Sequence, residues 1–195
     1  MLKETEKEFK YVVGSELFQA FLSKCNEKYP FVKHKLQANY YYDTDENALN
    51  KSRTTVRIRQ QYSYMKLQIK RHRKNKDGLA TSDEYSGQID TLPSTLEIPD
   101  VYDVLILKGV LITERTMFSF GKNSTICFDS NMYLGICDYE IEIEVDDGDI
   151  NLARMAIEDL GLTSKTFLSK SERFFRRLET MKNEYDSKKI YVRQN

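Results

Sequence analysis

Polar and apolar side chains alternate along several segments of the chain, beginning at its N-terminus. There, Glu6, Glu8 and Lys10 share one parity of the sequence, and Phe9 and Tyr11 share the other. Successive side chains on a strand point to opposite faces, so this segment is predicted to be a strand with a charged face and an apolar face. The same alternation recurs further along. We predict strands over residues 3–13, 38–43, 54–62, 65–72, 82–89, 111–121, 124–130 and 136–145.

Apolar residues three and four positions apart predict helices at both ends of the chain. After the first strand, Leu17, Phe18 and Phe21 form such a stripe. The other expected helices cover residues 150–160, residues from about 170 onward and, as one or two short helices interrupted by Pro99, residues 93–108. Eight mostly consecutive strands with helices at the start, middle and end predict the α+β class with an antiparallel sheet.

The composition is that of one ordinary globular domain, with 195 residues of which 40% are hydrophobic and 31% charged. We expect a single domain over residues 1–195, with a polar tail that frays after about residue 185. Lys plus Arg and Asp plus Glu both number 30, and this zero net charge argues against a nucleic acid polymer as partner. No apolar run approaches the ~18 residues of a membrane span. No membrane partner is therefore expected. Three cysteines without metal-type spacing favour a cytoplasmic protein with reduced thiols.

The charged positions on the predicted strands are sorted by sign. Two adjacent strands carry only basic residues at these positions, and a later strand carries only acidic ones. The basic residues are Arg57, Arg59, Lys66 and Lys70; the acidic residues are Glu140, Glu142 and Glu144. A sheet with one face in water explains alternation but usually mixes the two signs. Like charges two positions apart lie about 6.6 Å from each other and repel unless other groups neutralise them.

A closed or nearly closed barrel would account for this sorting. Eight antiparallel strands can curl until they enclose an interior. With the polar faces inward and helices over the apolar exterior, the interior becomes a hydrated channel with a basic and an acidic side. Arg and Lys bind phosphate oxygens, and carboxylates bind Mg²⁺ or Mn²⁺. The pattern therefore favours a metal-bound polyphosphate as the ligand.

At these positions the chain resembles the CYTH family, named for class IV adenylate cyclases and thiamine triphosphatase and also called the triphosphate tunnel metalloenzymes. Glu6-Lys7-Glu8-Phe9-Lys10 matches the ExExK signature of that family, and five further blocks follow in the family's order. These blocks are residues 39–44, 56–59, 67–70, 138–144 and 170–175. The chain is most similar to uncharacterised CYTH proteins of Gram-positive bacteria. The resemblance implies an eight-stranded antiparallel tunnel, a triphosphate-bearing substrate and a divalent cation.

The resemblance also implies roles for individual residues. The implied catalytic residues are Glu6, Glu8 and Lys10. The implied metal ligands are Glu6, Glu8, Asp129, Glu140, Glu142 and Glu144. The implied phosphate-binding residues are Lys10, Arg57, Arg59, Lys66, Lys70, Arg115, Lys170 and Arg173. Glu142 is the safest ligand of its strand, whereas the choice between Glu140 and Glu144 and the role of Glu84 stay open.

Three functions are compatible with this pattern. The first is a hydrolase of inorganic triphosphate or a simple organic triphosphate, with Mg²⁺ or Mn²⁺ as cofactor; one ion bridges phosphate oxygens and a second activates water. The second is a class IV-type adenylate cyclase that makes cyclic AMP from ATP. The third is a module that binds polyphosphate or a nucleotide without turnover. A homodimer is left open. His34 and His72 have no evident ligand or nucleophile partner and are interpreted as surface residues.

Overall fold

A computed structural model of the chain describes residues 1–73, 75–99, 101, 103–146, 149–163 and 168–187. The strands are β1 (Leu2–Val13), β2 (Phe31–Asp43), β3 (Thr54–Gln61), β4 (Tyr64–His72), β5 (Ala80–Ile89), β6 (Thr95–Leu96), β7 (Leu105–Phe120), β8 (Ser124–Tyr133) and β9 (Ile136–Glu144). The helices are α1 (Ser15–Lys28), α2 (Ala48–Lys51), α3 (Ile150–Leu160) and α4 (Lys170–Ser187). The tail was predicted to fray after about residue 185; α4 continues to Ser187, and residues 188–195 lie outside the described residues.

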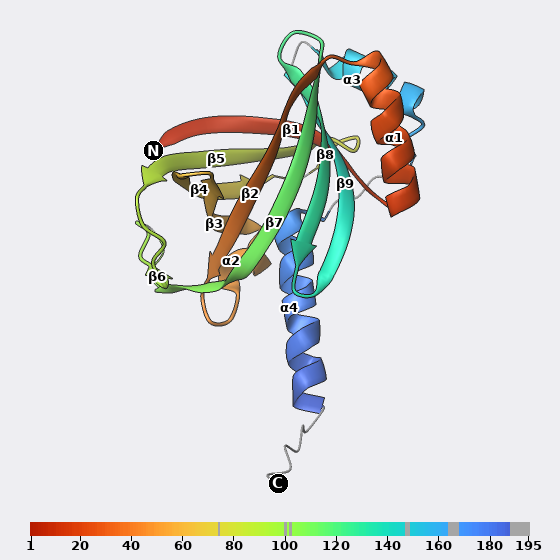
Figure 1. Ribbon diagram of the computed structural model, residues 1–195. Helices are drawn as coiled ribbons and strands as arrows, with labels where there is room; N and C mark the ends of the chain where they lie inside the picture. Colours follow the sequence, from red (N-terminus) through yellow and green to blue (C-terminus); the bar gives the residue numbers. More distant parts are fainter. Residues whose placement is uncertain (74, 100, 102, 147–148, 164–167, 188–195) are drawn as a thin grey trace.

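Eight of the strands close into an antiparallel barrel. Their order is β2-β3-β4-β5-β1-β9-β8-β7, and β2 pairs again with β7 to complete the ring. The short strand β6 extends the sheet beside β7 (Figure 1). The predicted fold, an eight-stranded closed barrel with flanking helices, is confirmed. Closure removes the free strand edges, because each of the eight barrel strands pairs with a neighbour on both sides.

The segment expected to be helical over residues 93–108 contains no helix in its described residues. Thr95 and Leu96 form β6, and β7 already begins at Leu105. The prediction of one or two short helices here is wrong for the described residues. Ile98 and Leu105 are buried against the outer faces of β2, β3 and β4, so they cover the barrel as a strap rather than as a helix.

Strand β2 also begins earlier than predicted, at Phe31 rather than Ala38. Residues 31–37 are mostly polar and show no clear apolar face. They are held extended because they pair with β7 along their length, from Phe31 opposite Phe118 onward. Tertiary pairing overrides the weak local pattern here.

Two helices cover the outside of the barrel where β1, β8 and β9 present their apolar faces. Phe18 of α1 packs against Phe128 of β8, with ring centroids 5.5 Å apart, and Ala153 of α3 joins the same core. Phe9 and Ile141 are fully buried in it. The charged side chains of the same strands must therefore point to the barrel interior.

Helix α4 closes the lower end of the barrel and then extends away from it (Figure 1). Its Phe174 packs on Tyr41, Leu111 and Tyr133, which belong to the inner faces of β2, β7 and β8. A Cβ atom on Gly109 would lie 2.9 Å from the Phe174 ring, and Gly109 has φ +148°, so a glycine is needed for this close approach. The interior is thus plugged at one end. None of the helices in the described residues combines the length and apolar character of a membrane span.

Candidate active site

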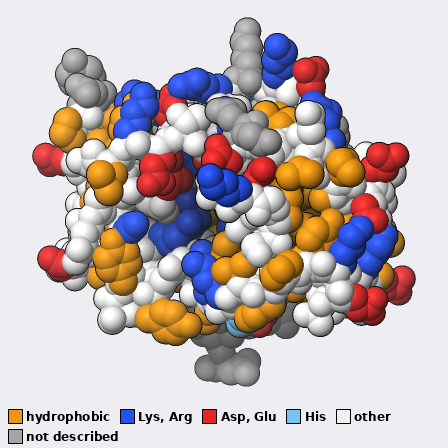
Figure 2. Space-filling model, turned by 90° about the horizontal axis from the view of Figure 1, so that it is seen from above, with side chains coloured by type: hydrophobic (Ala, Val, Ile, Leu, Met, Phe, Trp, Pro, Cys, Tyr) orange, Lys and Arg blue, Asp and Glu red, His pale blue; other side chains and the backbone are white. Residues whose placement is uncertain are grey.

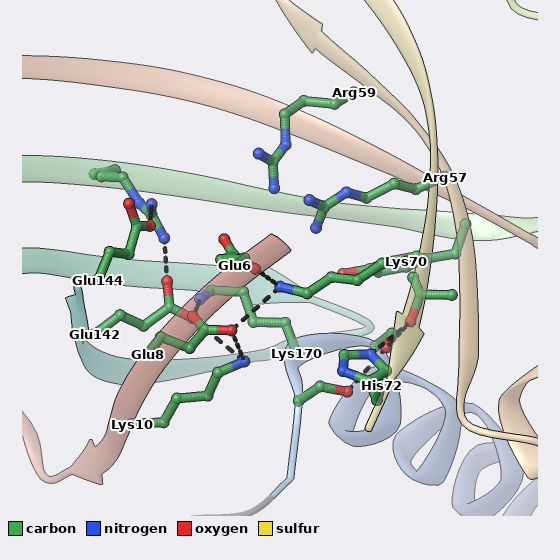
Figure 3. Close-up of a pocket in the computed structure, with 15 residues that line it drawn as sticks. Glu6, Glu8, Lys10, Arg57, Arg59, Lys70, His72, Glu142, Glu144 and Lys170 are labelled. Carbon is green, nitrogen blue, oxygen red and sulfur yellow. Dashed lines mark hydrogen bonds and ion pairs between the residues drawn. The ribbon is translucent and has the colours of Figure 1, made fainter. Parts of the chain in front are cut away.

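A cavity lies inside the barrel above the start of α4. Lys and Arg side chains are visible deep in the hollow on the face opposite α4 (Figure 2). Charged residues from five strands and from α4 line the cavity (Figure 3). They are Glu6, Glu8, Lys10, Arg57, Arg59, Lys70, His72, Arg115, Glu142, Glu144 and Lys170. Ten of these eleven were predicted as site residues, because alternation on each strand decides which side chains point inward.

Arg57 and Arg59 of β3 form the basic side of the cavity (Figure 3). Arg57 donates from Nε to Gln68 Oε1 at 2.9 Å, and Arg59 donates from Nε to Asn39 Oδ1 at 2.8 Å. Among the described residues, no carboxylate forms an ion pair with Arg59. Burial and the neighbouring charges of Arg57 and Arg115 lower the pKa of Arg59 to about 10. This guanidinium is therefore a cation that an incoming anion would stabilise.

Glu84 of β5, whose role stayed open, supports this basic side from behind. It accepts a hydrogen bond from Gln68 and lies 3.5 Å from an Arg57 nitrogen. Burial alone would raise the pKa of Glu84, but the charges of Arg57 and Lys70 lower it, so the carboxylate stays ionised. Glu84 does not line the cavity. Its contacts fit a residue that orients Arg57 through Gln68.

The carboxylates of β1 lie on the opposite side, next to two lysines. Glu8 Oε1 is 2.9 Å from Lys10 Nζ and 3.2 Å from Lys70 Nζ. Lys70 also contacts Glu6. Burial and the adjacent Glu6 raise the pKa of Glu8, although the two lysines oppose this change. The Glu6 side chain is 31% exposed and faces the open part of the cavity.

Three buried carboxylates of β8 and β9 converge on one point. Oxygen atoms of Asp129, Glu140 and Glu142 all lie within 4.8 Å of one another. The Lys170 ammonium group contacts all three, at 2.8, 2.5 and 2.7 Å respectively. Burial alone would lower the pKa of Lys170, but these carboxylates raise it well above its usual value, so the group stays charged. We call these three residues the acidic cluster.

Arg115 of β7 connects the acidic cluster to Glu144. It binds both Asp129 oxygens at 2.7 Å and contacts Glu142. Its third nitrogen lies 2.7 Å from Glu144 Oε1. Glu144 is 28% exposed to the cavity, whereas Glu140 is fully buried and bound to Arg173 and Lys170. Glu142 therefore belongs to the acidic cluster and also lines the cavity. Glu144 lines the cavity without belonging to the cluster.

The comparison with known families decides the identity of this fold. The model of the CYTH domain matches residues 4–175. The chain belongs to the CYTH domain family. Among proteins of curated function, none matches the chain. The resemblance inferred from the ExExK block and the later blocks is thus confirmed.

Three solved structures of other proteins are similar to this fold. A candidate adenylate cyclase from Bacillus halodurans is 26% identical, with a TM-score of 0.70 over 90% of this chain and 100% of that chain. A candidate adenylyl cyclase from Hippeastrum is 21% identical, with a TM-score of 0.71 over 88% and 95%. The capping enzyme triphosphatase of Mimivirus is 11% identical, with a TM-score of 0.53 over 81% and 89%. The last two likenesses, at low identity, concern the fold alone.

Four predicted residues of the CYTH site do not line the cavity. Asp129 and Glu140 lie behind it, in the acidic cluster. Arg173 binds Asp138 at 2.9 Å and Glu140 at 3.2 Å, so its contacts are with carboxylates. Lys66 is half-buried further along β4, with its ammonium group 5.5 Å from the centre of the Tyr64 ring.

The prediction that His72 is a surface residue is wrong. Its imidazole lines the cavity, and burial together with Lys70 and Lys10 lowers its pKa to about 3. The signal was present in the sequence, because His72 follows Lys70 by two positions on the same strand face. His34, in contrast, is exposed and lies 3.1 Å from Glu114.

Sequence reasoning also missed Lys35 of β2. Burial and the charges of Arg115 and Arg59 lower its pKa to about 8. Lys35 stands opposite Arg115 in the β2–β7 register and shares the inward parity of Asn39. An earlier start for β2 would have revealed this alternation. Lys35 does not line the cavity, but it adds a positive charge near Arg59 and Arg115 that the predicted set lacked.

Proposed function

We propose that this protein is a divalent-metal-dependent triphosphatase that acts on inorganic triphosphate or a simple organic triphosphate. The observation that carries the proposal is the division of one buried cavity into two sides. Arg57 and Arg59 lie on one side, and Glu6, Glu8 and Glu144 lie on the other (Figure 3). A chain of phosphates with a bound cation complements such a cavity in both charges.

The basic residues hold the phosphates. Arg57 and Arg59 keep nitrogen donors that point into the cavity, since each is oriented by an amide through Nε. Lys70 extends from the neighbouring strand β4 and Lys10 from β1, and they add two ammonium groups. Together they neutralise charge that builds on the phosphoryl group being transferred and on the leaving phosphate. Holding the bound phosphates in a fixed orientation also removes much of the entropic barrier to attack by water.

The carboxylates facing the cavity fit a divalent cation. Mg²⁺ and Mn²⁺ prefer carboxylate oxygens, and Mg²⁺ usually keeps several waters. Glu6 and Glu144 are partly exposed to the cavity, so they leave room for such waters, and Glu8 and Glu142 provide oxygen atoms beside them. When bound, the ion would act as a Lewis acid on phosphate oxygens.

The named activities of similar proteins support this class of reaction. The Hippeastrum protein has a dominant triphosphatase activity, and the Mimivirus protein is a capping enzyme triphosphatase. The Bacillus halodurans protein, a candidate adenylate cyclase, supports a second reading in which ATP is cyclised. Both reactions begin with the same grip on a triphosphate. They differ in whether water or the ribose 3′-hydroxyl attacks.

A product assay tests the proposal. The purified protein is incubated with tripolyphosphate or ATP and with Mg²⁺ or Mn²⁺, and phosphate, pyrophosphate and cyclic AMP are measured. We expect metal-dependent release of phosphate from tripolyphosphate. Cyclic AMP with pyrophosphate from ATP would show a cyclase instead. Binding of tripolyphosphate without turnover under either metal would contradict the enzyme proposal and show a binding module.

Two variants strengthen this assay. Glu6→Gln and Glu8→Gln each remove a charge facing the cation, and we expect turnover to fall at least about 100-fold, which corresponds to about 2.7 kcal/mol. Glu16→Gln on the exposed side of α1 is the matched control, and it should keep full activity. Full turnover in both Glu6→Gln and Glu8→Gln would show that these carboxylates do not take part in the reaction.

A further inference from the structure

The position of the Lys170 ammonium group within the acidic cluster has a consequence for metal binding. Asp129, Glu140 and Glu142 have the types and spacing of groups that hold a metal ion. Their shared centre is already taken, because Lys170 Nζ lies 2.5–2.8 Å from an oxygen of each. An ammonium group at this point leaves no place for a divalent ion at the 2.0–2.1 Å that Mg²⁺ requires.

Lys170 is fixed by the backbone around it. Ser169 and Glu172 form a reciprocal cap at the start of α4, with Ser169 N donating to Glu172 Oε2 at 2.7 Å and Glu172 N donating to Ser169 Oγ at 3.2 Å. Ser171 Oγ lies 2.7 Å from Thr55 Oγ1, which ties the same turn to β3. Both neighbours of Lys170 are thus held. Its side chain enters the acidic cluster as part of a rigid element.

The charges in this region are balanced without a metal. Three carboxylates form the cluster, and four cationic groups contact them: Lys170, Arg115, Arg173 and, through Glu142, Lys10 at 3.7 Å. All three carboxylates are buried. A divalent ion would add two charges to a buried group whose carboxylates are already paired with cations, or it would have to displace Lys170. Either change is opposed by the cost of unbalanced charge away from water.

Lys70 differs from Lys170 although it also contacts two carboxylates. Its partner Glu6 is partly exposed to the cavity, and Lys70 extends from a strand across open space (Figure 3). A phosphate entering the cavity can attract Lys70 away from Glu6 and Glu8. Lys170 also lines the cavity, but its ammonium group is held by three carboxylates, each of them less than one-tenth exposed.

We propose that Lys170 is a built-in cation that takes the place of a divalent ion in the acidic cluster, so that the cluster is closed to metal. The metal site of the proposed function then lies only on the side of Glu6 and Glu8. The claim about the acidic cluster stands independently of that function, and it concerns the number of ions that the chain binds. It replaces the expectation that Asp129 and Glu140 are metal ligands.

Counting bound Mn²⁺ tests this proposal. Free Mn²⁺ is measured by electron paramagnetic resonance during titration of the wild-type protein and of Lys170→Met, which keeps the side-chain volume but removes the charge. We expect Lys170→Met to bind one more Mn²⁺ per chain than the wild type. The matched control is Lys28→Met, which removes a lysine that pairs with Asp159 at 2.6 Å outside the barrel, and it should gain no ion. An equal count in Lys170→Met and wild type would overturn the proposal.

A second variant answers the same question if Lys170→Met does not fold. Asp129→Asn in the otherwise unchanged protein should leave the number of bound Mn²⁺ at the wild-type value, because Asp129 is paired with Lys170 and Arg115 rather than with metal. Loss of one ion would overturn the proposal. A wild-type protein that binds no Mn²⁺ would contradict the proposed metal-dependent function, while one ion gained by Lys170→Met would still support the role of Lys170.

Discussion

Arg59 and Asn39 face each other across β3 and β2, and the Asn39 amide oxygen accepts a hydrogen bond from Arg59 Nε at 2.8 Å. An amide orients a guanidinium group but does not neutralise it. Arg57 and Arg115 lie near enough to lower the pKa of Arg59, after burial, to about 10. The cavity therefore holds a cation in an electrostatically unfavourable position. A bound phosphate would supply the missing negative charge.

Replacing Arg59 should weaken tripolyphosphate binding and should not destabilise the protein without ligand. Arg59→Gln keeps a donor for Asn39 but removes the buried charge. We expect the dissociation constant for tripolyphosphate to rise about 10- to 100-fold, as for the loss of one charged hydrogen-bond partner. The melting temperature without ligand should stay equal or rise, because repulsion from Arg57 and Arg115 disappears. Isothermal titration and thermal unfolding measure the two effects.

Arg73→Gln provides the control for Arg59→Gln. Arg73 is exposed and pairs with Asp83 at 2.7 Å outside the cavity. Its replacement should leave tripolyphosphate binding unchanged, since exposed ion pairs contribute little. Arg59→Gln with wild-type affinity, or with a clearly lowered melting temperature, would show that Arg59 serves the fold and not the ligand.

Glu140 and Glu144, two residues of one strand face, should respond differently to replacement. Glu140 is fully buried between Lys170 and Arg173, so Glu140→Gln leaves buried cations unpaired and should lower the free energy of unfolding by about 3–5 kcal/mol. Glu144 is partly exposed to the cavity. Glu144→Gln should therefore unfold close to the wild type but lose turnover at least about 10-fold, the effect of about 1.4 kcal/mol.

Urea unfolding and phosphate release, measured on both variants, separate these two roles. The order of effects is the test. A stable Glu140→Gln protein without activity would show that Glu140 acts in turnover. A strongly destabilised Glu144→Gln protein would show that Glu144 serves the fold. Such a result would also weaken the division between the acidic cluster and the cavity.

The inward-facing charges could be predicted because a strand has a side-chain period of two. Once Phe9 is placed outside, Glu8 and Lys10 must lie inside. Sorting of the signs between strands then indicates a barrel with a basic and an acidic side. These local rules sufficed for the closed barrel and for most residues of the cavity.

The sequence could not reveal how the acidic residues are divided. That division depends on Lys170, which is 28 positions from its partner Glu142 and reaches it only when α4 closes the barrel. Residues 93–108 were wrongly predicted as helix. The sequence does not show that Ile98 and Leu105 are buried against the sheet. Both cases depend on tertiary contacts, which override local preference.

Lys35 should make tripolyphosphate binding depend on pH. Burial and nearby arginines lower its pKa to about 8, so this lysine loses its charge as the pH rises through that value. An anion binds the protonated form better, so affinity should fall above pH 8 by at most about tenfold per pH unit. Lys35→Met should remove this part of the pH dependence. Titration calorimetry between pH 7 and 9.5 gives both curves.

Lys33→Met is the control for Lys35→Met, since Lys33 lies two positions earlier on β2 and is exposed. The ligand's own titration is common to all three proteins and cancels in the comparison. The control should retain the wild-type slope above pH 8. If Lys35→Met also retains that slope, Lys35 does not act on the bound anion.

His72 should make the stability of the protein depend on pH below neutrality. Its pKa is about 3 in the folded protein, through burial and the charges of Lys70 and Lys10, against 6.5 for the ordinary imidazole. Between these values the unfolded chain binds a proton that the folded chain excludes, so stability falls as the pH is lowered from 6.5 toward 3. From pH 7 to 5 the loss from this group is at most about 2 kcal/mol. Urea unfolding of wild type and His72→Gln at both pH values measures it.

The His72→Gln variant should lose less stability between pH 7 and 5 than the wild type does. His34→Gln is the matched control, because the His34 side chain is 51% exposed, and it should follow the wild type. Saturating tripolyphosphate should reduce the difference between wild type and His72→Gln, since a bound anion offsets the charges of Lys70 and Lys10. Equal losses in His72→Gln and wild type without ligand would show that the imidazole is protonated in the folded protein and does not lie in a cationic cavity.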